Sequence, residues 1–319
     1  MRGLRSSFAH RGNTAIRSIS SAALASTAWH LAERRKAGER LSMRLRHLVE
    51  ALQVEDPLAG STELLPPIDL VFVAHPRDAD LLDVSIGCAL ATSRNPIART
   101  VIIVPDDFVE SGVLRYPGAS VVPESSVITP TIAEHIHQRF GRASSAWLLQ
   151  QVLKFQAVLS SNSAACLIVD ADTLLFRPRT WLTATGVQLL APSLEFWEPY
   201  AAHMERMWPE LDSRTPLSWV THHQLMQKDI VTEMFGARGE GLDAWIALAE
   251  TKPSPLSEYH SYGAYLFTQH RRRVHLAQWN NLPRPRAEFP AVLGDDFVGS
   301  VTLRLQGRRP HSVSFHHYL

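Results

Sequence analysis

Residues 68–107 read IDLVFVAHPRDADLLDVSIGCALATSRNPIARTVIIVPDD, and their hydrophobic period changes twice. The ends, IDLVFVAH and TVIIVPDD, are short apolar runs rich in β-branched residues and predict buried strands. A predicted helix between them carries four apolar residues on one face, namely Leu82, Ile86, Ala89 and Leu90. This β-α-β unit predicts an α/β fold with a mostly parallel central sheet, covered by helices and open to ligands at the carboxyl ends of its strands.

A later strand is predicted at residues 166–176, CLIVDADTLLF, and contains Asp170 and Asp172 one residue apart. In a regular strand these side chains would point to opposite faces, so they converge only where the strand breaks into a turn. Two carboxylates at a turn suit Mn²⁺ or Mg²⁺ and leave coordination positions open for a diphosphate. The alternatives are an ordinary acidic turn and the phosphatase-like hhhDxDxT motif, which needs threonine where the chain has Leu174.

A helix predicted from about residue 144 to 160 leads into that strand. Its buried face carries Leu148, Val152, Phe155 and Leu159, and the neighbouring flank carries Trp147, Gln151 and Lys154. We predict that Gln151 and Lys154 bind the donor, the amide by hydrogen bonds and the ammonium by its charge. The alternative is that this flank is a solvated helix edge.

Five segments occur in a fixed order, IDLVFVAHPRD, WLLQQVLKF, LIVDADTLLFRP, VTHHQLM and SEYHSYGAY. Together they resemble the bacterial domain-of-unknown-function 6492 family over about residues 66–270. The resemblance implies the GT-A glycosyltransferase fold and a nucleotide-sugar-dependent, hexosyltransferase-like enzyme. It does not identify the sugar or the acceptor. The last segment departs from the family pattern only in its middle pair, His260 and Ser261.

The resemblance also implies roles for the polar residues near the donor. His75 and Arg77 follow the first strand, where such a fold would meet the nucleotide, and Asp170 would join them. The alternative for this segment is a turn that caps the next helix. Asp172 and Glu258 are the predicted catalytic residues, and Glu258 would accept the proton of the acceptor hydroxyl in an inverting reaction. In a retaining reaction Glu258 would bind the acceptor or stabilise the transition state, and its structural alternative is a helix N-terminal residue beside a serine cap.

Two further groups are assigned to the acceptor and the metal. His222 and His223 are adjacent, so one is predicted to contact a sugar while the other is structural, and the sequence does not rank them. Tyr259 and Tyr262 are predicted to contact the acceptor. His316 would add a third ligand to the cation held by Asp170 and Asp172, by a loose analogy with glycogenin-like enzymes, and a mobile polar tail is the alternative.

The first 65 residues predict a basic helical N-terminal arm and a linker, before a GT-A-like domain over residues 66–319. Residues 1–50 carry ten Lys or Arg against three Glu, with an amphipathic stripe of Leu41, Leu45, Leu48 and Leu52. Packing on the main domain and peripheral contact with the inner face of a membrane stay open for this helix. An organellar targeting peptide is another alternative for the arm.

The composition is that of a soluble globular protein, with 45% hydrophobic and 20% charged residues and a formal net charge of +1. This balance argues against a nucleic-acid partner. Only two cysteines, Cys88 and Cys166, occur, which excludes a disulfide framework and predicts a reducing, cytoplasmic location. The predicted activity is sugar transfer from a nucleotide diphosphate to a hydroxyl of a carbohydrate or lipid-linked acceptor. The alternatives are a nucleotidyltransferase or phosphohydrolase on a related sheet, and a non-catalytic scaffold.

Overall fold

The computed structural model describes residues 56, 58–59, 63–110, 117–193, 197–211, 217–250, 255–289 and 310–317. Most of the predicted basic arm lies outside these residues, so its helix and its membrane contact stay predictions. Within the described ranges, no helix has both the length and the apolar character needed to cross a membrane.

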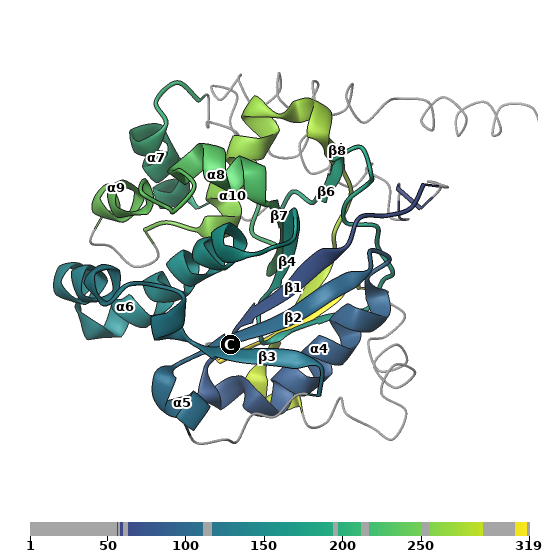
Figure 1. The fold of residues 1–319 in the computed structure, drawn as a ribbon, viewed down its shortest axis with the longest axis horizontal. Coiled ribbons are helices and arrows are strands. Elements are labelled where there is room, and N and C mark those ends of the chain that lie inside the picture. Colours follow the sequence, from purple (N-terminus) through teal and green to yellow (C-terminus); the bar gives the residue numbers. More distant parts are fainter. Residues whose placement is uncertain are drawn as a thin grey trace, which may run out of the picture.

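A five-stranded central sheet in the order β3-β2-β1-β4-β7 organises the chain (Figure 1). Its strands are β1 (Ile68–Val73), β2 (Ile97–Val104), β3 (Ala119–Pro123), β4 (Ala165–Val169) and β7 (His223–Gln227). The first four are parallel and β7 runs antiparallel to β4, which confirms the predicted mostly parallel sheet. The chain leaves β1 toward β2 on one side and returns to β4 on the other. The carboxyl ends of β1 and β4 therefore border the crevice where open α/β sheets bind ligands.

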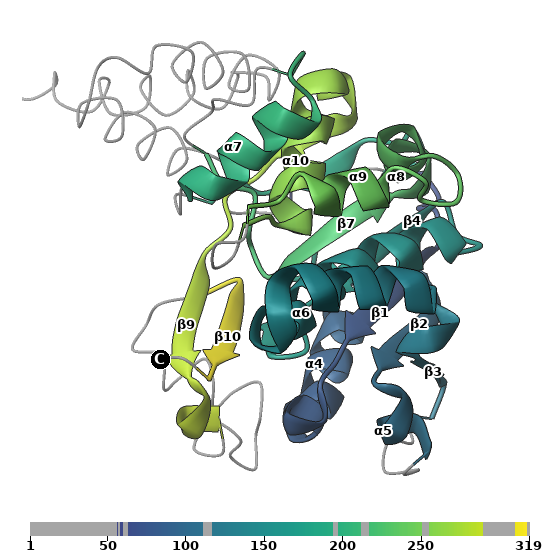
Figure 2. The ribbon, with the colours of Figure 1, turned by 90° about the vertical axis from the view of Figure 1, so that its left-hand side faces the viewer.

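Helices cover both faces of this sheet, as Figures 1 and 2 show. They are α4 (Ala79–Thr92), α5 (Asp106–Glu110), α6 (Pro130–Ser160), α7 (Glu198–Met207), α8 (Lys228–Phe235), α9 (Leu242–Ala247) and α10 (Glu258–Gln269). Short 3-10 helices are η2 (Pro76–Asp78), η3 (Glu124–Ser126), η4 (Arg271–Arg273) and η5 (Arg286–Glu288). Helix α4 buries Leu82, Ile86 and Ala89 as predicted, but Leu90 is 45% exposed because it lies just off that face.

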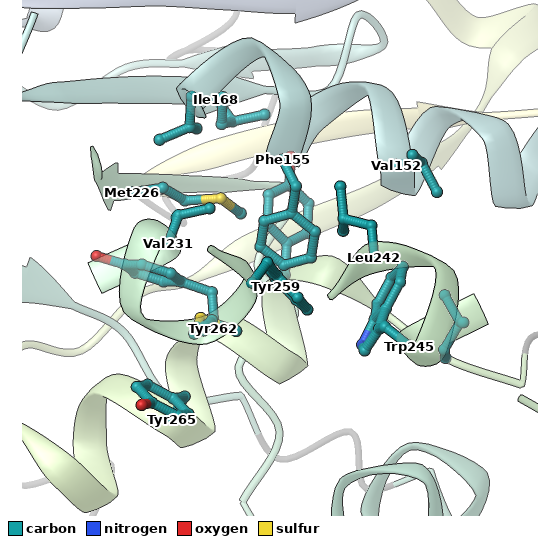
Figure 3. Close-up of a cluster of buried hydrophobic side chains, with 14 of the residues drawn as sticks. Val152, Phe155, Ile168, Met226, Val231, Leu242, Trp245, Tyr259, Tyr262 and Tyr265 are labelled. Atoms are coloured by element: carbon teal, nitrogen blue, oxygen red, sulfur yellow. The ribbon is translucent and has the colours of Figure 1, made fainter. Parts of the chain in front are cut away.

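Alternation along the strands divides the core into two layers. Val71 and Val73 of β1 face the α6, α8 and α10 side, whereas Leu70 and Phe72 face the α4 side. On the first side, the ring centroid of Phe155 lies 4.8 Å from that of Phe235 and 5.4 Å from that of Trp245. Phe155 belongs to the cluster drawn in Figure 3. Full burial of each such side chain contributes roughly 1.5–3 kcal/mol.

Helix α6 is longer than predicted and begins at Pro130. It is broken at Gly141, whose φ of 71° and ψ of 164° are a backbone conformation that only glycine adopts without strain. The predicted apolar face of its second half is buried. The long element therefore delivers its Trp147, Gln151 and Lys154 flank to the carboxyl end of the sheet.

Two small sheets complete the fold. One has the order β5-β10-β9, from β5 (Thr173–Leu175), β10 (Ser312–His316) and β9 (Asn281–Pro285), and the other pairs β6 (Gln188–Leu190) with β8 (Val274–Leu276). Helix α4 packs against the first of these through Leu81 and Cys88. The mobile-tail alternative for the C-terminal histidines is wrong for the described residues 312–316, which form a buried strand beside β5.

Candidate active site

The acidic turn lies between β4 and β5. Strand β4 ends at Val169, and the amide of Thr173 donates to the carbonyl of Asp170 at 2.9 Å, which closes the turn. The strand thus breaks where the sequence requires it, and both Asp170 and Asp172 line one cavity of about 620 Å³. That volume lies in the range of about 300–1,000 Å³ that is usual for small-molecule sites. The cavity opens at the crevice between the carboxyl ends of β1 and β4.

A buried ion cluster forms the floor of this cavity. The ammonium of Lys154 lies 2.6 Å from Asp170 Oδ1 and 2.6 Å from Glu258 Oε1. It also lies 4.3 Å from the ring centre of Tyr259, whose hydroxyl donates to Asp170 Oδ1 at 2.8 Å. The side chains of Lys154 and Glu258 are 6% and 1% exposed. The alternative of a solvated helix edge is therefore wrong for Lys154.

The cluster sets the charge of its members. Burial alone would lower the pKa of Lys154, but Asp170 and Glu258 outweigh it and raise that pKa, so the amine stays an ammonium. Burial would raise the pKa of Asp170, yet the ammonium and His222 hold it below its usual value. Burial and the charge of Asp170 raise the pKa of Glu258 against the opposing effect of Lys154. The two carboxylates on one ammonium therefore differ in basicity, and Glu258 is the more basic.

The structure separates the two adjacent histidines. His222 has a φ of 62°, and its Nδ1 lies 3.2 Å from Asp170 Oδ2 in the cavity. His223 begins β7 and points the other way, where its Nδ1 bonds the carbonyl of Thr221 at 2.8 Å and its ring packs 4.0 Å from Trp279. Burial lowers the pKa of His223 to about 3, which keeps it neutral. His223 is therefore the structural member of the pair, and the sugar contact stays a prediction for His222, which lines the cavity.

Asp172 faces the C-terminal strand. Its Oδ2 lies 3.4 Å from Nδ1 of His316, and the rings of His316 and His222 are 4.8 Å apart. A carboxylate and an imidazole that face each other in a cavity are a suitable pair of donors for a divalent cation. No three His, Cys, Asp or Glu side chains in the described residues form a ready metal centre.

The segment after β1 is divided between the cavity and the surface. His75 is exposed, and its Nδ1 accepts a hydrogen bond from the amide of Arg77 at 3.2 Å, so it caps η2. His75 is not among the residues that line the cavity, and its donor contact stays a prediction. Arg77 does line the cavity. Asp78 and His317 line it as well, with Oδ1 and Nε2 3.1 Å apart.

Helix α10 presents one of its two tyrosines to the site. Tyr259 lines the cavity, whereas the hydroxyl of Tyr262 donates to Gln188 at 2.7 Å and accepts from the amide of Gln227 at 2.8 Å. Tyr262 is fully buried and is not among the lining residues, so Tyr259 is the tyrosine placed for the predicted acceptor contact. The following Gly263 lets α10 approach Trp219, since a Cβ there would lie 2.5 Å from the Trp219 side chain.

The first turn of α10 is fixed from two sides. Ser257 Oγ accepts from the amide of His260 at 3.3 Å, so the serine cap that was the alternative reading of Glu258 is present. The carboxylate of Glu258 nevertheless faces Lys154. Glu258 is therefore both the first residue of a serine-capped helix and a member of the ion cluster. Gln151 is 4% exposed and lines the cavity, and its Oε1 accepts from the amide of Glu258 at 3.4 Å. Gln151 thus ties α6 to the start of α10.

Several lining residues were not predicted from the sequence. They are Trp197, Tyr200, Ser218 and Val220, and they come from two separate segments. The available signal was a tryptophan and a tyrosine three residues apart in the segment WEPY, residues 197–200, at the start of α7.

Comparisons with known proteins give glycosyltransferases among the similar solved structures. The galactosyltransferase LgtC in complex with donor and acceptor sugar analogs has a TM-score of 0.42 and 13% identity, over 78% of this chain and 87% of that chain. Mouse xyloside xylosyltransferase 1 in its apo form has a TM-score of 0.41 and 9% identity, over 79% and 98%. No family model and no curated protein matches the chain. At these scores, the fold assignment rests on the strand order and connections of the chain itself.

Proposed function

We propose that this chain is a glycosyltransferase of the GT-A type and a member of the domain-of-unknown-function 6492 family. It would move a sugar from a nucleotide-diphosphate donor to a hydroxyl acceptor. The observation that carries the proposal is the acidic turn of Asp170 and Asp172 at the crevice between β1 and β4, facing Lys154 and Glu258 in one cavity.

The charges of the cavity floor indicate how a diphosphate would bind. Asp170, Asp172 and Glu258 are three carboxyl groups against the one ammonium of Lys154, so the floor alone repels an anion. Asp172 and His316 would hold Mn²⁺ or Mg²⁺ there, and Asp170 stays the further ligand that the sequence predicts. The bound cation would supply Lewis acidity and neutralise the charge of the diphosphate leaving group.

The remaining residues would position the reacting groups and accept a proton. Lys154 fixes Asp170 and Glu258, while His222 and Tyr259 hydrogen-bond Asp170 and set its orientation. Arg77, at the edge of the cavity that follows β1, would contact the phosphates. The raised pKa of Glu258 suits a group that takes the proton of an acceptor hydroxyl as the new glycosidic bond forms.

A ligand panel tests this proposal against the other two functions. Thermal unfolding of the full chain is followed with nucleoside diphosphates, nucleotide sugars, nucleoside triphosphates and phosphomonoesters, each with and without Mn²⁺ or Mg²⁺. We expect stabilisation by at least one nucleotide sugar that depends on the metal, and release of the sugar when that donor is incubated with the protein.

Three other results would contradict the proposal. Turnover of triphosphates or phosphomonoesters, without any effect of nucleotide sugars, would indicate a nucleotidyltransferase or a phosphohydrolase. Stabilisation by no nucleotide under any metal condition would indicate a non-catalytic scaffold. Metal-dependent binding that persists in Asp172→Ala would move the cation away from the acidic turn.

A further inference from the structure

One wall of the cavity is aromatic. Trp197 precedes α7, Tyr200 lies in its first turn and Trp147 lies on α6, and all three line the cavity. Tyr200 also packs toward α10, with its ring 5.8 Å from that of His260. We call Trp147, Trp197 and Tyr200 the aromatic wall. It is made by two helices and therefore has a fixed place beside the acidic turn.

The exposure of Trp197 requires an explanation. Its side chain is 48% exposed, and it is the one aromatic residue among the exposed large hydrophobic side chains of the described ranges. Apolar surface left in water forgoes roughly 25 cal/mol for each Å², so a half-exposed indole at a cavity is suited to gain that energy when a ligand covers it.

The groups between the aromatic rings define what such a ligand would be. Gln150, Ser218 and Ser257 line the cavity and offer an amide and two hydroxyls, whereas the aliphatic lining is limited to Val73, Ala171 and Val220. A pyranose ring has C–H groups on its faces and hydroxyls on its rim. It would therefore stack on the aromatic rings and, at the same time, form hydrogen bonds with the polar groups. An acyl chain would offer no acceptor to the Gln150 amide or to the hydroxyl protons of Ser218 and Ser257, which is unfavourable.

The sheet order places Trp197 and Tyr200 away from the proposed donor phosphates. Arg77 and Asp78 follow β1, whereas Ser193, four residues before Trp197, pairs with Ser218 ahead of β7, and β1 and β7 flank β4 on opposite sides. The acidic turn after β4 therefore lies between a charged side and an aromatic side. A charged ligand and an uncharged ligand would meet at that turn.

We propose that the aromatic wall binds the uncharged sugar ring of a carbohydrate acceptor, with Trp197 as the residue that determines acceptor affinity. The acceptor is thus a saccharide, free or as the headgroup of a glycolipid. This inference rests on the proposed function for its chemical consequence, but the binding of sugar to the wall is measurable without any nucleotide.

Saturation-transfer NMR on the full chain tests the binding. The probes are the methyl glycosides of glucose, galactose and mannose, with lactose and maltose, in the absence of nucleotide. We expect ring protons of at least one saccharide to receive saturation, and Trp197→Ala to weaken its affinity about 10-fold, as loss of about 1.4 kcal/mol of stacking would. Leu90→Ala, which removes an exposed apolar side chain from α4 on the other face of the sheet, should change nothing.

A second measurement separates this inference from the proposed function. Trp197→Ala should keep the thermal stabilisation by the nucleotide sugar and its slow hydrolysis by water, while losing transfer to the saccharide. Loss of nucleotide binding in Trp197→Ala would mean that the wall binds the base, and would overturn the inference. Saccharide affinity equal in Trp197→Ala and the unchanged protein, or no saccharide binding at all, would overturn it too. Saccharide binding at Trp197 without any nucleotide effect would retain the subsite and reject the donor chemistry.

Discussion

Two charge-compensated aspartates, one on β1 and one just past the neighbouring parallel strand β4, show what separates a structural charge from a site. Asp69 of β1 is 2% exposed, and its oxygens are bonded by Arg99 at 2.7 Å and by the hydroxyls of Ser161 and Ser163 at 2.8 Å each. Asp170, just past the end of β4, is also held by a base and by hydrogen bonds. The two carboxylates are therefore similar in compensation and number of partners, although the side chain of Asp69 is 3% exposed and that of Asp170 is 23% exposed.

The difference lies in what surrounds the partners. None of the Asp69 partners lines the cavity, and the guanidinium of Arg99 faces solvent with 43% of its side chain. Lys154, Tyr259 and His222, which hold Asp170, all line the cavity. A charged cluster thus becomes a site when its compensating groups are also the groups that a ligand would touch.

The largest expected effect comes from removing the central ammonium. Lys154→Met leaves Asp170 and Glu258 buried without a counter-charge, so we expect the free energy of unfolding to fall by about 3–5 kcal/mol, measured by urea denaturation. Lys228→Met is the matched control, because its ammonium makes a single 2.6 Å bond to the carbonyl of Ser161, and should cost about 1 kcal/mol. Equal losses in the two variants would mean that Lys154 compensates no buried charge. Adding Glu258→Gln to Lys154→Met should restore part of the stability.

The next effect separates activity from stability. Asp172 is 23% exposed and has no ammonium partner among the described residues, so Asp172→Asn should change the unfolding free energy by less than about 0.5 kcal/mol. Sugar release from the donor should fall about 100-fold or more, because the residue would act on the departing diphosphate. Asp107→Asn, at an exposed aspartate of α5, is the control. Full activity in Asp172→Asn would remove this residue from the proposed mechanism.

The third experiment concerns the cluster around Asp69, which does not line the cavity. Asp69→Asn weakens one charge-assisted bond and two hydroxyl bonds, so we expect a loss of about 2 kcal/mol in unfolding free energy. Thermal stabilisation by the nucleotide sugar, measured relative to the variant alone, should stay unchanged. A selective loss of nucleotide affinity in Asp69→Asn would show that the two clusters are coupled, and would contradict the purely structural role of Asp69.

The smallest effect tests buried imidazoles away from the charged floor. Burial lowers the pKa of His203 and His260 to about 4, against about 6.5 in the unfolded chain. Between these values the unfolded chain binds protons that the folded chain does not, so stability is present above about pH 6.5 and is lost as the pH falls toward 4. His260→Met should reduce the loss of unfolding free energy between pH 7 and 5.5 by about 1 kcal/mol. His137→Gln, at an exposed histidine of α6, should leave that loss unchanged.

Local periodicity predicted the parts of the molecule that depend on it. The β-α-β unit, the break at Asp170 and Asp172, and the flank of α6 that carries Lys154 all follow from neighbouring residues along the chain. Such patterns are set by the alternation of strands and the turn of helices, which a single sequence displays directly.

Nonlocal pairing decided what the sequence left open. Whether His222 or His223 enters the cavity depends on the register of β7 against β4, in which His223 pairs with Val169. His316 reaches Asp172 only because β10 pairs with β5, from the far end of the chain. Tyr262 belongs to the core because Gln188 of β6 accepts a hydrogen bond from its hydroxyl group. None of these partners lies near in sequence, so propensity could not select them.

The left-handed backbone of His222 has a consequence for the insertions and deletions that this chain could tolerate in evolution. With φ at 62°, residue 222 turns one imidazole into the cavity while the next residue starts a strand that sends its ring into the core. Deleting or inserting one residue directly before β7 would exchange these two positions and put the wrong neighbour in each. Length variation among relatives should therefore be rare between Ser218 and His223, and an alignment gap there would mark a different site.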